Sequence, residues 1–145
     1  MFKRVLMGLL ILGTVQAGAQ VERINGTGVL PPDLPFSEAV KVGNTLYLSG
    51  QIGVVNGTFE LAKGGIEAET HQVMRNMRTV LATQGLSLSD LVKCTVMLAD
   101  IAEWPKFNSI YATYFKQGFP ARSAFGADGL AGGARVEVEC IAAYE

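Results

Sequence analysis

Histidine and cysteine, on which many catalytic and metal sites depend, are scarce in this sequence, which has one histidine and two separated cysteines. These residues do not supply the ligands of a zinc site of the usual spacing. A Ser-His-Asp triad would have only His71 as its base, and His71 falls in a predicted helix where a surface position is favoured. A phosphate-binding GxxxxGK[ST] loop is missing as well. We therefore expect neither a metal nor a cofactor.

Positive charge is also in short supply. The chain has 12 lysines and arginines against 13 aspartates and glutamates. Without Lys3 and Arg4, which precede the first apolar run, ten basic side chains remain against thirteen acidic ones, a formal charge of −3. A domain with this balance lacks the electrostatic footprint of a protein that binds a phosphate backbone. Nucleic acid is therefore not an expected partner.

The longest apolar run lies at the N-terminus. Residues 1–4 end in two basic side chains, residues 5–15 carry no charge, and residues 17–19 are Ala-Gly-Ala. This order is typical of a secretory signal peptide, and the run is shorter than the roughly 20 residues that span a bilayer. We expect a leader at 1–19, one domain at 20–145, and an exported protein, periplasmic or secreted, with no membrane attachment after cleavage. A buried N-terminal helix is the alternative.

The two cysteines, Cys94 and Cys140, lie in separate strand-like runs at 92–98 and 136–142. An exported chain could oxidise them to a disulfide. A bridge would require that the two strands be adjacent and that the Cβ atoms face each other. Two buried free thiols are the other interpretation, which the sequence alone slightly favours.

Hydrophobic periodicity divides the remaining chain into strands and two helices. Glycine within a strand often marks a bulge or a close backbone approach, and Gly50 is such a residue. Two helices can cover only one face of the resulting sheet, so the other face is expected to be buried by association of subunits. The predicted elements are strands at 20–25, 36–42, 45–52, 58–61 and 90–98, helices at 64–85 and 103–116, and terminal strands at 119–123 and 135–140.

The two terminal strands flank a glycine-rich loop at 126–133, which predicts a hairpin. If the loop closes symmetrically, Arg122 lies opposite Glu137, with about 4.5–5.5 Å between their Cβ atoms. A guanidinium grips a carboxylate through two parallel hydrogen bonds, and a glutamate positions or deprotonates a water molecule. The pair predicts a site where water attacks a small carboxylate-bearing molecule. An ordinary cross-strand ion pair is the equally weighted alternative.

Five segments of the sequence resemble motifs of the RidA family, also called the YjgF family. They occur in the family's order, with compatible spacing, and span nearly the whole expected mature chain. Ser49–Ile52 matches its SGQI segment, and 90–96 resembles its D-V-K-T-T-V strand. Residues 108–115 resemble its N-x-x-Y-x-x-(Y/F)-F helix. Residues 119–123 match F-P-A-R-S, and 136–139 match the closing (V/I)-E-(V/I)-E strand.

The resemblance implies an α+β fold of the bacillus chorismate mutase-like type, in which a mixed sheet carries two helices on one face. It also implies a homotrimer with ligand sites between subunits. The implied activity is cofactor-free hydrolytic deamination of reactive enamines and imines, such as 2-aminoacrylate, to 2-oxo acids and ammonia. A non-enzymatic small-carboxylate-binding or chaperone-like protein of the same fold is the alternative. A ribonuclease is disfavoured by the acidic balance and the scarcity of histidine.

The resemblance also implies a role for each site residue. Arg122 would bind the substrate carboxylate, and Glu137 would hold or activate the attacking water. The backbone around Ser49 and Gly50 and the side chain of Asn108 would line the pocket.

Phe36 and Ala124 are the two other expected substrate-binding residues, and both depart from the family pattern. The family often has a tyrosine where this chain has Phe36, and a cysteine where it has Ala124. Loss of the tyrosine hydroxyl removes a donor near the pocket, and loss of the cysteine removes a site of modification. Because neither change touches the arginine or the glutamate, we expect both to affect the range of substrates more than activity itself.

Overall fold

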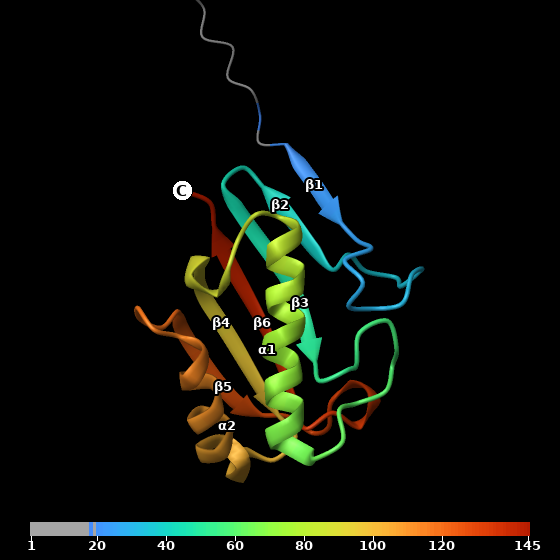
Figure 1. The fold of residues 1–145 in the computed structure, drawn as a ribbon, viewed down its shortest axis with the longest axis vertical. Coiled ribbons are helices and arrows are strands. Elements are labelled where there is room, and N and C mark those ends of the chain that lie inside the picture. The colour runs from blue at the N-terminus through green and yellow to red at the C-terminus, as the bar shows by residue number, and fades with distance from the viewer. Residues whose placement is uncertain (1–17, 19) are drawn as a thin grey trace, which may run out of the picture.

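The computed structural model of the chain describes residue 18 and residues 20–145. The predicted leader, apart from Gly18, lies outside the described residues. Residues 20–145 form a six-stranded mixed sheet, and both α-helices lie on one face of it (Figure 1). In this part of the chain, no helix is long and apolar enough to cross a membrane.

The sheet runs in the order β1-β2-β3-β6-β4-β5. All neighbouring strands are antiparallel except β4 and β5, which are parallel. The strands are β1 (Val21–Ile24), β2 (Ala39–Val42), β3 (Thr45–Ile52), β4 (Leu91–Leu98), β5 (Ala121–Gly126) and β6 (Val136–Ala143). The helices are α1 (Gly65–Thr83) and α2 (Trp104–Tyr111).

The core fills the space between the helices and the sheet. The apolar stripe of α1 is buried as its periodicity predicts, with Val73, Met77 and Leu81 inaccessible to solvent. Helix α2 keeps its proline in the first turn and is shorter than predicted, because the chain continues as a 3-10 turn at Ala112–Tyr114.

The predicted strand at 58–61 is reduced to one isolated bridge between Val54 and Leu61. Phe59 and Glu60 are both exposed, so this segment has no buried apolar face to stabilise a longer ladder.

The predicted terminal hairpin is wrong. Strand β5 pairs only with β4, in parallel, while β6 lies between β3 and β4. The alternate side chains Val136, Val138 and Cys140 of β6 are buried, and a strand buried this way needs hydrogen-bonding partners along both edges. Strand β5 is mostly exposed, which suits the edge of the sheet.

This topology separates Arg122 from Glu137. Arg122 lies beside Cys94 in the β4–β5 ladder, and Cys94 belongs to the core beneath the helices. Glu137 lies between the buried residues Val136 and Val138, so it points to the opposite side of the sheet, hereafter the open face. The two residues therefore lie on non-adjacent strands and opposite faces. The predicted cross-strand pair therefore does not form, and Glu137 alone of the two lies on the open face.

Cys94 and Cys140 form a disulfide. They are direct partners in the β4–β6 ladder, their Cα atoms are 4.1 Å apart, and both side chains are buried. The interpretation as buried free thiols is therefore wrong, because the register gives the facing geometry that a bridge requires. The bond closes a sequence separation of 46 residues. By restricting the unfolded chain, such a bond stabilises a fold by about 2–4 kcal/mol.

Candidate active site

One half of the candidate site is built around Arg122. This residue belongs to β5, and its half-buried side chain contacts α2. Its Nη2 donates a hydrogen bond to Oδ1 of Asn108 at 2.7 Å. Its guanidinium carbon lies 4.8 Å from the centroid of the Tyr111 ring and 5.6 Å from that of Phe107. The amide oxygen and the two ring faces hold the cation in place without neutralising its charge.

No carboxylate within the described part of the chain pairs with Arg122. The two ion pairs found there join Lys106 to Glu67 and Arg135 to Glu103. A guanidinium has five N–H donors, so the bond to Asn108 leaves donors for a ligand. This arrangement suits two-pronged binding of a carboxylate from outside the chain.

The aromatic rings beneath Arg122 were missed as site residues, because the sequence places Phe107 and Tyr111 on the apolar face of a helix. Both are buried, as that pattern predicts, yet they also contact the cation. Burial raises the pKa of Tyr111 to about 12, and Arg122 opposes the rise. The phenol is therefore neutral at physiological pH and serves as a wall of the site. The sequence feature that could have identified the two rings is their spacing of four residues, which places them on the same side of the helix, next to Asn108 in the sequence.

The other half of the site lies on the open face, where β3 meets β6. The register of these strands shifts between Leu48 and Gln51, so Ser49 and Gly50 form the predicted bulge. A Cβ atom at Gly50 would lie 2.0 Å from Oε1 of Glu137. Only glycine permits this approach, which places the carboxylate directly over the bulge.

The bulge presents its backbone, because the hydroxyl of Ser49 is already engaged. That hydroxyl donates to the carbonyl oxygen of Ser37 at 2.6 Å, and the Ser49 amide donates to the carbonyl oxygen of Glu38 at 3.0 Å. The Glu38 side chain is buried and accepts a 3.0 Å hydrogen bond from the amide of Thr27. Phe36, which precedes this anchored segment, is 49% exposed.

Glu137 has the environment of a proton acceptor. Burial raises the pKa of its carboxyl, and the neighbouring charge of Glu139 raises it further. The carboxylate receives no hydrogen bond from residues 20–145, so both of its oxygens can accept one from a ligand or from water. A carboxylate with a raised pKa takes up a proton more readily near neutral pH.

The two halves do not meet within one chain. The ladder partners of Arg122 and Glu137 are Cys94 and Met97, which are three residues apart on β4. Strand geometry then separates the Cα atoms of Arg122 and Glu137 by about 14 Å, from about 3.3 Å per residue and about 4.8 Å per strand. Ala124 lies two residues after Arg122 on the same helix-covered face and packs against the edge of the core.

Within residue 18 and residues 20–145, no three histidine, cysteine, aspartate or glutamate side chains are grouped to hold a metal ion. The arrangement offers a carboxylate anchor at Arg122 and a proton acceptor at Glu137. The first suits the carboxylate of a small acid, and the second suits a water molecule that gives up a proton.

This fold defines a YjgF-type α+β protein whose edge strand carries an arginine without a carboxylate partner among residues 20–145. Residues 28–144 match the family described as Endoribonuclease L-PSP. The 2-iminobutanoate/2-iminopropanoate deaminase of Homo sapiens is 40% identical over 123 residues, which are 84% of this chain and 90% of that protein. The chain belongs to the Endoribonuclease L-PSP family, the family that also bears the names RidA and YjgF.

Solved structures of similar proteins support the same fold. RidA from the Antarctic bacterium Psychrobacter sp. PAMC 21119 matches with a TM-score of 0.79 at 34% identity, covering 85% of this chain and 99% of that one. The yeast protein YEO7 matches with a TM-score of 0.80 at 36% identity, covering 87% of this chain and 100% of that one. The α+β fold with two helices on one face of a mixed sheet is thereby confirmed.

The close approach at the bulge predicts a strong coupling between Gly50 and Glu137. Gly50→Ala should lower the free energy of unfolding by about 1–3 kcal/mol, because the added methyl group overlaps the carboxylate. Urea denaturation of Gly50→Ala, Glu137→Ala and the double variant measures this coupling. The double variant should recover most of the lost free energy of unfolding, since alanine replaces the glutamate that the added methyl group overlaps. An equal loss with and without the Glu137 side chain would contradict the close approach.

Proposed function

We propose that the protein hydrolyses reactive enamines and imines derived from amino acids, releasing a 2-oxo acid and ammonia. The observation that carries this proposal is Arg122, which is held by Asn108 and two aromatic rings but has no carboxylate partner among residues 20–145. Its free donors fit the carboxylate of an imino acid. The name of the human relative, a 2-iminobutanoate/2-iminopropanoate deaminase, supports the same class of substrate.

In the proposed mechanism, Arg122 binds the substrate carboxylate, and Glu137 accepts a proton from water as its oxygen attacks the imine carbon. As the C–O bond forms, the imine nitrogen takes a proton from solvent, which gives a carbinolamine. The carbinolamine nitrogen then takes the proton held by Glu137, the C–N bond breaks to release ammonia, and the hydroxyl proton passes to solvent as the C=O bond forms. An enamine first takes a proton on carbon to become the imine. Imine and water thus account for every atom of the products. Positioning and charge matching supply the catalysis, because imine hydrolysis has a low intrinsic barrier.

We also propose that the active protein is a homotrimer, in which Arg122 of one subunit faces Glu137 of the next. The separation of the half-sites supports this, since neither is complete within one chain. The open face supports it too, because Tyr47 is 48% exposed there, and Met97 and Ile141 are half-buried. A closed ring of three heterologous contacts covers these residues and forms three identical sites.

A small-carboxylate-binding protein without catalysis is the second candidate function. It would use Arg122 and Asn108 in the same way. It would not require the proton acceptor at Glu137, so the two functions differ in what a change of that residue does.

Arg122→Ala should reduce the acceleration of imino acid hydrolysis at least about a hundredfold. It removes two charged hydrogen bonds to the substrate, each of about 1.5–3 kcal/mol. The decay of imino acids generated in situ by an amino-acid oxidase measures the rate. Arg23→Ala on β1 is the matched control and should keep full activity.

Glu137→Gln should lose turnover while still binding a stable carboxylate. If the unaltered protein accelerates none of several imines, the binding function holds instead.

Mixing two inactive variants tests whether the site is shared between subunits. Chains with Arg122→Ala and chains with Glu137→Gln should each be inactive alone. Each mixed trimer should recover about a third of full activity, because one of its three interfaces joins an intact arginine to an intact glutamate. Co-expression with two affinity tags isolates the mixed trimers. No recovery in trimers shown to be mixed would mean that both residues act from the same subunit.

We propose further that the protein is exported and acts on imines formed by oxidation of amines or amino acids outside the cytoplasm. The leader pattern at 1–19 and the disulfide between Cys94 and Cys140 support this, since disulfides persist in oxidising compartments. Intact-mass measurement of the exported protein should show a chain that starts at Gln20 and is two hydrogens lighter than the dithiol form. Recovery of the full 145-residue chain from the cytoplasm alone would overturn the proposal.

A further inference from the structure

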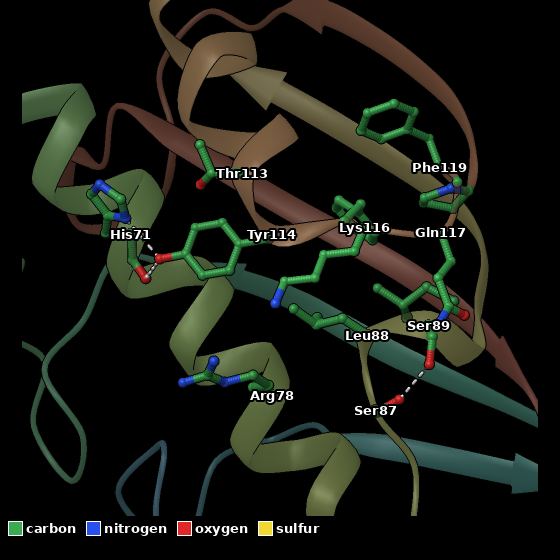
Figure 2. A pocket seen from close by; sticks show the side chains of 14 residues that line it. His71, Arg78, Ser87, Leu88, Ser89, Thr113, Tyr114, Lys116, Gln117 and Phe119 are labelled. Carbon is green, nitrogen blue, oxygen red and sulfur yellow. Dashed lines mark hydrogen bonds between the residues drawn. The ribbon is translucent and has the colours of Figure 1, made fainter.

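A cavity of about 780 Å³ lies apart from both halves of the candidate site. It is bounded by α1, by the 3-10 turn at Leu88–Asp90, and by the segment that joins α2 to β5 (Figure 2). Arg122, Asn108 and Glu137 do not line it. Its volume falls within the range of about 300–1,000 Å³ that is usual for small-molecule sites.

All charged side chains that line the cavity are basic. Arg78 from α1 and Lys116 from the connecting segment line it together with His71. Neither Arg78 nor Lys116 forms an ion pair within residues 20–145. The carboxylate of Asp90 in the adjoining turn already accepts hydrogen bonds from the amide of Ser87 at 2.7 Å and from its hydroxyl at 3.0 Å. The cavity therefore holds two cations without an ion-pair partner among residues 20–145, on a chain whose net charge is negative.

The cations come from separate elements, and both line the cavity. Figure 2 shows Lys116 extended from the connecting segment toward α1, with its amine between Tyr114 and Arg78. Tyr114 is fixed by a contact of 2.7 Å between its hydroxyl and Nδ1 of His71. Two cations that line one cavity from different elements suit an anion of double charge, because a single carboxylate is already satisfied by one guanidinium.

The other wall of the cavity is aromatic and apolar. Phe119 is 63% exposed, and its ring centroid lies 5.7 Å from that of Phe115. Leu88 and Leu91 form a buried apolar floor. An exposed phenylalanine beside an apolar floor offers a surface on which a flat aromatic group can stack.

We propose that this cavity binds a small organic dianion that carries an aromatic group, the chemistry of an aryl phosphate monoester. The phosphate lies between Arg78 and Lys116, and the aromatic group packs against Phe119. This site is separate from the proposed hydrolytic site, so it stands whether or not the protein hydrolyses imines.

Calorimetric titration of the whole mature protein with phenyl phosphate tests the site. The variant Arg78→Gln/Lys116→Gln should bind at least about tenfold more weakly, because it loses charged hydrogen bonds of about 1.5–3 kcal/mol each. The matched control Lys63→Gln/Arg75→Gln makes the same change in net charge outside the cavity and should bind as the unaltered protein does. Arg122→Gln should also bind normally. Both altered residues of the test variant are exposed, so the fold should be retained, as circular dichroism can check.

The aromatic part of the proposal has its own measurement. Phe119→Ala should weaken binding of phenyl phosphate and leave binding of inorganic phosphate unchanged. Amide chemical shifts of residues 116–119 should move on titration. The proposal is overturned if phenyl phosphate does not bind, if the Arg78/Lys116 variant binds it like the control variant, or if Arg122→Gln abolishes binding. Benzoate binding as tightly as phenyl phosphate at these residues would overturn the assignment to a dianion.

Discussion

The position of β4 between β5 and β6 constrains every charged residue of the candidate site. Its two ladders fix Arg122 beside Cys94 and Glu137 beside Met97, and the alternation of side chains then sends the two charges to opposite faces. The disulfide holds β4 to β6 in this register. The arginine reaches the rings of α2, and the glutamate reaches the bulge of β3, because this one strand separates them.

That separation has a chemical benefit. An arginine beside a glutamate would form an ion pair, which would lower the pKa of the carboxyl and occupy the guanidinium donors. In the observed fold, Arg122 keeps free donors, while burial raises the pKa of Glu137. One group remains able to bind an anion, and the other remains able to accept a proton. The carboxylate of the proposed substrate supplies the anionic partner that Arg122 lacks among residues 20–145. Water supplies the proton that Glu137 accepts.

Much of the fold was predictable from local pattern. Helix α1 follows from the spacing of Val73, Met77 and Leu81, and the bulge follows from a glycine late in β3. The pairing of β5 was not predictable this way, because a glycine-rich loop between two strands is compatible with a hairpin and also with a connection past a third strand. The sequence reports periodicity within an element, whereas the choice of neighbours depends on burial across the whole sheet.

The candidate site shows the same division. Motifs identified Arg122, Glu137, Gly50 and Asn108, and the structure places the first with Asn108 and the second over Gly50. The support from Tyr111 was hidden, because a ring that packs in a core gives the same helical spacing as one that also faces a cation. The disulfide stayed undecided until the register of two distant strands was known.

If the active protein is the proposed trimer, its site is divided between two faces of the sheet, and catalysis is a property of the assembly. In the proposed trimer, an isolated subunit carries every required residue and still has no complete site. Activity then varies with the concentration of the protein, because dilution below the dissociation constant of the trimer dismantles the sites without unfolding the chain. An enzyme released into a large volume outside the cytoplasm would meet that limit first. Tight association between subunits would therefore be required for its activity.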